Sequence, residues 1–371
     1  MGSAVPVLYY HRVNRVDRRM AAGPELFLAQ MRRLQQSGWR ALTMAEILRF
    51  IETGDKPGVK CLAITFDDGF ADNYYYAFPA LQAAGMKAVI FLITERVGQG
   101  PARESETERV VRPFDEANKA ALAGDFADYL RASEIRRMAA SGVVEFGSHT
   151  MRHWPCFKGP AIERFILSAS PHWARQVLAQ GDLRPGVPLY EWASAVAVRR
   201  YHPDPAVKEK LVAFMRERGG IAAIKEQGKQ AWTKKLREEA RGIIAASRGS
   251  ELESGAAAQK RVHEELRKSR EAVKEFSGAP CLALCWPWGH YSGLGIEAAE
   301  KAGYKLAFVT EPGAVVVDSD PFTLKRVRVS GAISPRALDL MLAACSTRAG
   351  AGLMAALSRA GSGDQGGRSD Y

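Results

Sequence analysis

The chain has 371 residues, of which 47% are hydrophobic and 25% are charged, and its formal net charge at pH 7 is +11. This composition is that of an ordinary soluble enzyme, long enough for one large α/β domain with an insertion. No apolar run approaches the roughly 20 residues that a transmembrane helix needs, and the acids that interleave with the basic residues argue against nucleic-acid binding.

Short apolar runs alternate with helical patterns along the chain. This alternation predicts an α/β fold with a mostly parallel sheet whose strands are joined by crossover helices. The predicted strands cover Val5–Tyr10, Cys61–Phe66, Lys87–Ile93, Val143–Phe146, Cys281–Cys285, Lys305–Val309 and Leu324–Val329. The predicted helices cover Pro24–Ser37, Met44–Glu52, Tyr74–Ala84, Ser133–Ala140, Gly295–Ala302 and Pro335–Arg359.

Two adjacent carboxylates end the second predicted strand, in the motif Thr65-Phe66-Asp67-Asp68-Gly69. Successive side chains of a strand point in opposite directions, so one carboxylate can reach a metal while its neighbour reaches a water molecule. The glycine permits the sharp turn that opens such a site. By itself the motif could equally be a plain turn, so it needs a second feature beside it.

A histidine pair supplies that second feature. His149 and His153 follow the strand predicted at Val143–Phe146, and one helical turn would place both imidazoles on the same face. Two imidazoles and one carboxylate leave coordination positions open, which is typical of catalytic rather than structural zinc. We therefore predict that Asp68, His149 and His153 bind a divalent metal. Zinc is the default for these ligands, and cobalt, nickel or iron fit the same set.

These motifs resemble those of the polysaccharide deacetylases of the NodB-homology type (carbohydrate esterase family 4), metal-dependent enzymes that deacetylate N-acetylated sugars. Three motifs carry the resemblance: Thr65–Gly69, Gly147–His153 and the aromatic turn Trp286–Gly289. The opening strand, which ends in Tyr10-His11, is similar to that of the branch that acts on poly-N-acetylglucosamine. The resemblance spans about residues 5–155 and 278–330, and it implies a distorted (β/α)7-type barrel.

The residue types and the resemblance together suggest a role for each site residue. Asp67, next to ligand Asp68 but not needed as a ligand, is the expected general base. The resemblance implies that the backbone N–H of Trp288 stabilises the oxyanion. We also expect Trp286, Pro287 and Tyr10 among the substrate-binding or oxyanion residues, although the aromatic ones could as easily be core residues.

The general acid is open between two histidines. A leaving amine needs a proton, and histidine suits that role near neutral pH. The family takes this histidine from a late Leu-x-His motif, but no histidine follows His290 here. The likeness to the poly-N-acetylglucosamine branch implies His11 instead, with His290 as the competitor. An arginine that pairs with the base in other members is also missing before Trp286, and Arg326 or Arg328 could supply its charge.

A long insertion interrupts the motifs. Residues 158–276 carry 23 lysines and arginines against 15 aspartates and glutamates, and the later part has mostly helix-forming patterns. We expect a catalytic barrel from residues 1–157 and 278–345, a basic helical insertion at 158–277, and a C-terminal helix end with a disordered tail at 346–371. The insertion is either a solvated subdomain or a surface that contacts an anionic glycan, a membrane surface or a protein partner.

Cysteine usage and the N-terminus bear on localisation. Five cysteines without Cys-x-x-Cys spacing, some of them in strand runs, suggest a reducing compartment. The chain begins Met1-Gly2-Ser3-Ala4 and shows no signal peptide. We expect a cytoplasmic protein, or an exported one whose leader has been removed.

The sequence therefore predicts a metal-dependent hydrolase that removes N-acetyl groups from an amino sugar in a polysaccharide or glycoconjugate. Its partner would be the N-acetylated saccharide, without nucleic acid. Two alternatives stay open: hydrolysis of a non-sugar amide by the same residues, and a catalytically inactive carbohydrate-binding protein.

Overall fold

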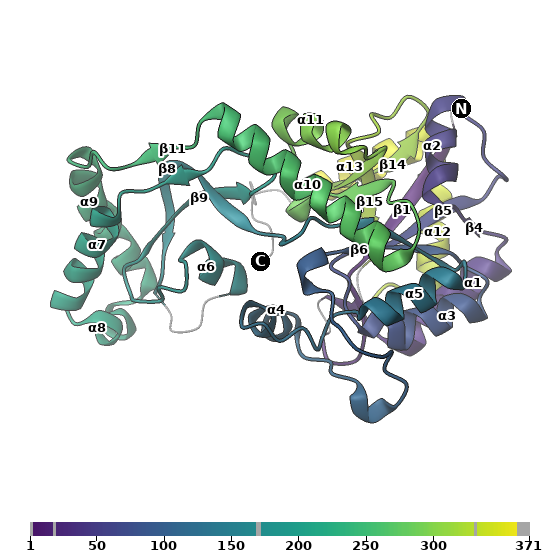
Figure 1. Cartoon of the computed structure of the whole chain (residues 1–371), viewed down its shortest axis with the longest axis horizontal. Coiled ribbons are helices and arrows are strands. Elements are labelled where there is room, and N and C mark those ends of the chain that lie inside the picture. The colour runs from purple at the N-terminus through teal and green to yellow at the C-terminus, as the bar shows by residue number, and fades with distance from the viewer. Residues whose placement is uncertain (1–2, 18–19, 168–171, 330–331, 362–371) are drawn as a thin grey trace. The chain divides into compact units, whose positions relative to one another are not determined.

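The computed structural model describes residues 3–17, 20–167, 172–329 and 332–361 (Figure 1). The chain divides into two compact units. The first unit contains the described residues of Met1–His153, His263–Tyr291 and Ile296–Ser369, and we call it the barrel unit. The second unit is formed mainly by Trp154–Val262, and we call it the insertion unit.

Seven parallel strands close into a barrel within the described part of the chain. Their order around the barrel is β1 (Ala4–Tyr10), β5 (Cys61–Phe66), β6 (Ala88–Leu92), β7 (Val144–Ser148), β12 (Ala283–Cys285), β13 (Leu306–Pro312) and β15 (Leu324–Arg328). The barrel closes because β1 pairs with both β5 and β15, so that Leu8 faces Ile64 on one side and Val327 on the other. All seven predicted strands, and the barrel that the resemblance implies, are confirmed.

Short strands and helices complete the barrel unit. The strands are β2 (Arg12–Val13), β3 (Ala21–Ala22), β4 (Arg40–Ala41) and β14 (Ala314–Val316). The helices are α1 (Pro24–Gln36), α2 (Met44–Thr53), α3 (Phe78–Ala83), α4 (Phe114–Leu122), α5 (Ala132–Ala140), α11 (Gly293–Ala302), α12 (Pro335–Cys345) and α13 (Arg348–Gly361). The prediction of a single helix over Pro335–Arg359 is wrong, because α12 and α13 divide this stretch. Ser346 caps the end of α12, and the Thr347 hydroxyl accepts a hydrogen bond from the Gly350 N–H near the start of α13. The tail predicted beyond α13 lies outside the described residues.

The core of the barrel is built from the apolar runs that predicted the strands. Every residue of β1 and β5 is buried, as expected for parallel strands that are covered on both faces. One buried cluster joins side chains from the barrel strands, among them Val7, Phe91 and Phe308, to Ile47 and Phe50 of α2. This apolar packing holds the carboxyl ends of the strands in fixed positions.

The insertion unit is not purely helical, which corrects our prediction. It contains an antiparallel pair, β8 (Pro155–Phe165) with β9 (Pro188–Ser194), in addition to its helices. Gly159 and Pro160 interrupt the strand pattern of β8, and the register shifts between Phe157 and Ile162. Glycine and proline weaken any strand prediction and often mark such bulges. This strand was therefore not predicted from the sequence.

The rest of the insertion unit is mostly helical. Its elements are α6 (Trp173–Leu178), β10 (Tyr201–His202), α7 (Pro205–Glu217), α8 (Gly220–Gln227), α9 (Lys229–Ala245), β11 (Glu251–Leu252) and the start of α10 (Gly255–Ser277). The unit ends at Val262, whereas we predicted an end at residue 277. The second half of α10 belongs to the barrel unit, because it contacts other barrel residues. In one such contact, the Tyr304 hydroxyl donates to the Leu266 carbonyl at 3.0 Å.

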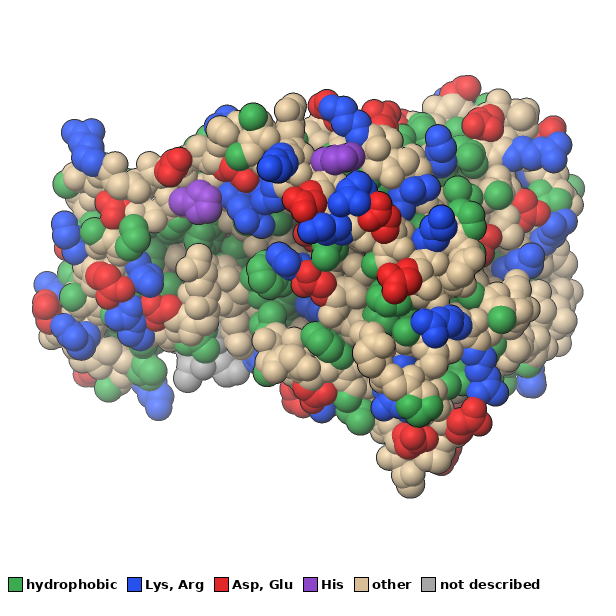
Figure 2. Space-filling view, in the orientation of Figure 1, with side chains coloured by type: hydrophobic (Ala, Val, Ile, Leu, Met, Phe, Trp, Pro, Cys, Tyr) green, Lys and Arg blue, Asp and Glu red, His purple; other side chains and the backbone are tan. Residues whose placement is uncertain are grey.

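Charged side chains of both signs are interspersed over the face drawn in Figure 2, without a large area of a single sign. No helix among the described residues is both long and apolar enough to cross a membrane.

Candidate active site

The predicted site residues gather at the carboxyl ends of the barrel strands. Asp67 and Asp68 follow β5, His149 follows β7, Trp288 follows β12, and His11 follows β1. Backbone contacts join these ends, since the Asp67 N–H donates to the Tyr10 carbonyl at 3.0 Å and the His149 N–H donates to the Leu92 carbonyl at 2.7 Å. In parallel barrels, functional groups lie at this end, because the loop that follows each strand begins there.

Asp68, His149 and His153 form a buried group that could hold a metal ion. The Asp68 Oδ1 atom lies 3.6 Å from the Nε2 atom of His149 and 4.0 Å from that of His153. The Nδ1 atom of His149 lies 2.8 Å from the Cys285 carbonyl, which can only accept. Nδ1 therefore carries the hydrogen, and Nε2 presents a lone pair toward Asp68. No local sequence pattern marks this orienting carbonyl, which comes from the neighbouring strand β12.

The electrostatics of this group fit a divalent cation. Burial, followed by the charge of Asp67, raises the pKa of Asp68 to about 7. Burial lowers the pKa of both His149 and His153 below the usual value of histidine, so both imidazoles are neutral at pH 7. A buried carboxylate that faces two neutral imidazoles lacks a balancing positive charge. A bound cation would supply it, and both imidazoles are already in the form that binds metals.

A second group of possible ligands fits a metal less well. Asp67, His149 and Cys285 also bring ligand atoms close together. Burial raises the pKa of the Cys285 thiol well above its usual value, however, so the sulfur stays protonated. Metal binding requires a thiolate, and both Asp67 oxygens already accept hydrogen bonds from Arg326. This favours the group that contains Asp68.

The two histidines converge without a helical turn, which corrects our prediction. Thr150 and His153 have the positive φ angles of 67° and 56°, so the segment is a tight loop. The Thr150 side-chain oxygen holds this loop by accepting a hydrogen bond from the His153 N–H at 3.0 Å. Asp68 and Trp288 also have positive φ angles, of 75° and 56°. Such conformations are costly for residues other than glycine and are concentrated at functional sites.

Asp67 forms a buried ion pair with Arg326 of β15. The two guanidinium Nη atoms donate to the two carboxylate oxygens at 2.7 and 2.8 Å. Burial by itself would raise the pKa of Asp67, but the charge and hydrogen bonds of Arg326 outweigh burial and hold this pKa well below its usual range. Of the two arginines that could replace the missing family arginine, Arg326 is the one that pairs with Asp67, whereas the side chain of Arg328 is exposed.

Other barrel residues hold Arg326 in place. Its Nε atom donates to the Val309 carbonyl at 3.0 Å, and its Nη atoms also reach the Thr65 hydroxyl and the Cys285 sulfur. The guanidinium lies 4.4 Å from the centre of the Tyr9 ring. The side chain is therefore fixed from several strands, and Asp67 is fixed with it.

Both candidate acids lie in the barrel unit. His11 is partly buried, with its ring 6.0 Å from that of Tyr9. Burial lowers the pKa of His11 to about 4, against a smaller opposite effect of the Asp67 charge. The ring of His290 lies 6.4 Å from that of Trp288. His11 is thus within electrostatic reach of the expected base, and its role as the acid stays a prediction.

The third motif contributes Trp288, whose ring lies 4.2 Å from that of His153. Gly289 beside it has a φ angle of 72°, and a Cβ atom there would lie 2.2 Å from the Thr310 hydroxyl. Only glycine fits this turn. The turn thus packs directly against one of the predicted metal ligands.

Three other expected contact residues are buried. The Trp286 indole donates to the Phe322 carbonyl at 2.9 Å, and Pro287 is buried in the turn. The Tyr10 hydroxyl donates to Gln30 at 3.1 Å, and its ring stacks on Phe66. For Trp286 and Tyr10, this packing favours core roles over substrate contact.

A seven-stranded parallel α/β barrel with an acid pair and a histidine pair at its strand ends has the architecture of the NodB-type (β/α)7 barrel. Residues 54–176 match the family model named polysaccharide deacetylase, and the predicted resemblance to this family is thereby confirmed.

Similar proteins agree with this assignment. The Bacillus subtilis (strain 168) protein YxkH, whose name assigns it provisionally to the polysaccharide deacetylases, is 23% identical over 330 residues, or 89% of this chain and 73% of that protein. The poly-beta-1,6-N-acetyl-D-glucosamine N-deacetylase of Escherichia coli (strain K12) is 25% identical over 78% of this chain, which spans only 31% of that protein. A solved de-N-acetylase from Aggregatibacter actinomycetemcomitans shares the fold, with a TM-score of 0.55 at 15% identity over 91% of this chain and 98% of that one.

Proposed function

We propose that this protein is a metal-dependent hydrolase that removes N-acetyl groups from an N-acetylated amino sugar in a polysaccharide or glycoconjugate. The observation that carries the proposal is the Asp67–Arg326 pair beside the group of Asp68, His149 and His153. The likeness to polysaccharide deacetylases, one of which is named for poly-beta-1,6-N-acetyl-D-glucosamine, supports a saccharide as the substrate.

Asp68, His149 and His153 would hold the divalent cation, with zinc as the default metal. When bound, the cation would polarise the acetyl carbonyl and make water more acidic. The chain prepares the site for it, because the Cys285 carbonyl fixes the tautomer of His149 and the loop of Thr150 positions His153. Such outer contacts orient the ligands of many metal sites.

Asp67 is the proposed general base. Arg326 keeps its carboxylate ionised at neutral pH and aligned by two hydrogen bonds, while each oxygen retains a further lone pair that can accept a proton. The low pKa makes Asp67 a weak base. A weak base suffices where the attacking water is already acidic, and a fixed base loses little entropy in reaching it.

His11 is the proposed general acid. The nitrogen of the breaking amide must be protonated, because an amide anion is a very poor leaving group. His11 is neutral in the free protein at pH 7, so it would first take up a proton that Asp67 has accepted and then pass it to the leaving nitrogen. The backbone N–H of Trp288 would donate to the developing oxyanion, and His290 is the competing acid.

Acetate release from N-acetylglucosamine oligomers tests the proposal, with metal-stripped protein compared with protein loaded with zinc or cobalt. We expect release that depends on the metal and is lost in the Asp67→Asn variant. Metal bound at one equivalent without acetate release would instead favour a non-sugar amide as the substrate. Neither binding nor release would favour a catalytically inactive carbohydrate-binding protein.

A further inference from the structure

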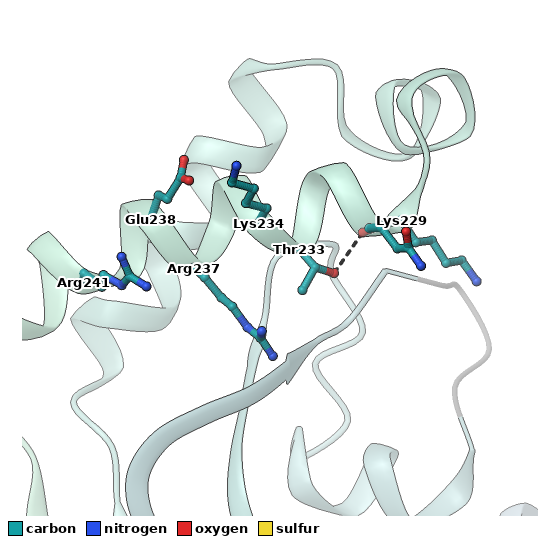
Figure 3. Close-up of a pocket in the computed structure, with 7 residues that line it drawn as sticks. Lys229, Thr233, Lys234, Arg237, Glu238 and Arg241 are labelled. Carbon is teal, nitrogen blue, oxygen red and sulfur yellow. Dashed lines mark hydrogen bonds between the residues drawn. The ribbon is translucent and has the colours of Figure 1, made fainter. Parts of the chain in front are cut away.

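One face of α9 in the insertion unit lines a hollow of about 610 Å³. The lining side chains are Lys229, Gln230, Thr233, Lys234, Arg237, Glu238 and Arg241. Figure 3 shows the labelled residues projecting from successive turns of this one helix, with the Thr233 hydroxyl bonded to the Lys229 carbonyl. Four of the seven are cations and one is an acid, so the hollow carries a positive charge. We call it the α9 hollow.

The cations of the α9 hollow differ in their partners from Arg184 and Arg261 of the same unit. Elsewhere in the unit, Arg184 contacts both Asp182 and Glu209 at 2.7 and 2.8 Å, and Arg261 contacts Glu253 at 2.7 Å. Within the described structure, no acid forms an ion pair with the side chains of Lys229, Lys234 or Arg241. No described residue therefore neutralises their charges by an ion pair, and these charges are available to an external anion.

The opposite side of α9 is committed to the core of the insertion unit. Trp232 and Leu236 are buried there against side chains that include Leu211 and Met215. The outward side has no large apolar residue in the lining, so it has nothing to insert into a lipid bilayer. Arg237 is partly committed as well, because its guanidinium donates to the Glu163 carbonyl of β8 at 3.0 Å. This contact helps to fix the helix beside the strand.

The spacing of the cations suits an extended polyanion. At 1.5 Å per residue, the stretch from Lys229 to Arg241 is ~18 Å long, so it can face several anionic groups in a row. A hollowed surface fits a chain better than the flat surface of a membrane. The Gln230 amide and the Thr233 hydroxyl between the cations can form hydrogen bonds with hydroxyl groups, which a glycan has in abundance.

We propose that the α9 hollow binds a carboxylate- or phosphate-bearing stretch of glycan, so that the protein selects anionic polysaccharides over neutral ones. This inference rests on the proposed function, because it assigns a substrate class to the same hydrolase. A surface with unneutralised positive charge raises the local concentration of a polyanion and speeds its association. Salt weakens such binding, because the charges are exposed to solvent.

The test compares two N-acetylglucosamine-containing oligosaccharides of equal length, hyaluronan with its carboxylates and neutral chitin. Binding is measured by calorimetry to the full-length, metal-loaded chain carrying Asp67→Asn, so that neither ligand is consumed. We expect tighter binding of hyaluronan, which weakens as salt is added. The substitutions Lys229→Gln, Lys234→Gln and Arg241→Gln together should weaken hyaluronan binding about tenfold and flatten its salt dependence. They should leave chitin binding unchanged.

A matched control removes three other exposed helical lysines, with Lys210→Gln, Lys260→Gln and Lys274→Gln, and so loses the same charge. Equal weakening by the control and the α9 variant, or equal affinity of the two oligosaccharides, would overturn the proposal. So would binding to phosphatidylglycerol vesicles that the α9 variant loses, if hyaluronan shows no preference. Acetate release from chitin oligomers by the α9 variant is measured in parallel. The same assay is run on the wild-type, metal-loaded chain. If that chain releases no acetate while the Asp67→Asn chain still prefers hyaluronan, the result would contradict the proposed function and leave the anion site standing.

Discussion

The barrel unit and the insertion unit differ in how far the ion pairs compared below are exposed to solvent. The barrel buries ion pairs: Asp67 with Arg326, Arg12 with Asp72 and Arg103 with Glu134 have side chains that are at most 3% exposed. In the insertion, the side chain of Arg184 is 49% exposed although it contacts two acids. Breaking a buried pair costs about 3–5 kcal/mol, whereas an exposed pair contributes about 0–1 kcal/mol. These three barrel pairs thus fix buried side chains, whereas the contacts of Arg184 in the insertion stay at the surface.

The largest effect should come from a metal ligand. Asp68→Ala removes the one carboxylate of the predicted metal group, so metal content should fall close to zero and acetate release should disappear. The measurement is the metal-to-protein ratio of the purified variant. Asp318 has a similar φ angle of 70° in an exposed turn, so Asp318→Ala controls for the strain of alanine in this conformation. Full metal occupancy in Asp68→Ala would remove Asp68 from the ligand set.

Loss of the base should come next. Asp67→Asn keeps the size of the side chain but cannot accept the proton, so turnover should fall about 10³- to 10⁴-fold. Metal content should be unchanged, because Asp67 is held by Arg326 and is not a predicted ligand. Steady-state rates and metal analysis on the same preparation test this pair of outcomes. Near-normal turnover would exclude Asp67 as the base.

The two candidate acids can be separated by the leaving group. His11→Ala should slow hydrolysis of amides about 10²- to 10³-fold and affect activated esters far less, because an alkoxide or phenolate leaves without a proton. His290→Ala is the matched variant, and it should show no such difference between the two substrates. If His290→Ala shows the difference and His11→Ala does not, the acid is His290.

Arg326 should affect both turnover and stability. Arg326→Met leaves Asp67 buried without a partner, so the free energy of unfolding should fall by about 3–5 kcal/mol. Turnover should fall about 10- to 100-fold, mainly in kcat, because the base loses its alignment. Arg328→Met, two residues along the same strand but exposed, should change stability by no more than about 0.5 kcal/mol. Equal effects of the two variants on unfolding by denaturant would contradict the special role of the pair.

The smallest effect should come from the insertion. The combined Lys229→Gln, Lys234→Gln and Arg241→Gln variant should unfold within about 0.5 kcal/mol of the wild type, because surface substitutions rarely do more. Denaturant unfolding measures this. A loss of several kcal/mol would mean that these cations support the fold of the insertion, contrary to the difference between the two units.

Local sequence patterns were sufficient to predict the barrel strands and most of the candidate site. Strands buried on both faces appear as short apolar runs, so Cys61–Phe66 and the other six runs were visible without knowledge of their partners. The acids and histidines were visible because they directly follow such runs, as in Asp67-Asp68 after β5 and His149 after β7. Local patterns are sufficient for features that depend only on neighbours in the chain.

The contacts between side chains from distant parts of the chain could not be predicted in this way. Arg326 reaches Asp67 across 259 residues of sequence, and only the closure of the barrel by β15 against β1 places it inside while leaving Arg328 exposed. Barrel packing likewise buried Tyr10 and Trp286, and a tight loop, not a helical turn, brought His149 and His153 together. Each of these outcomes depends on contacts between distant segments and on positive φ angles, neither of which a local pattern of residue types encodes.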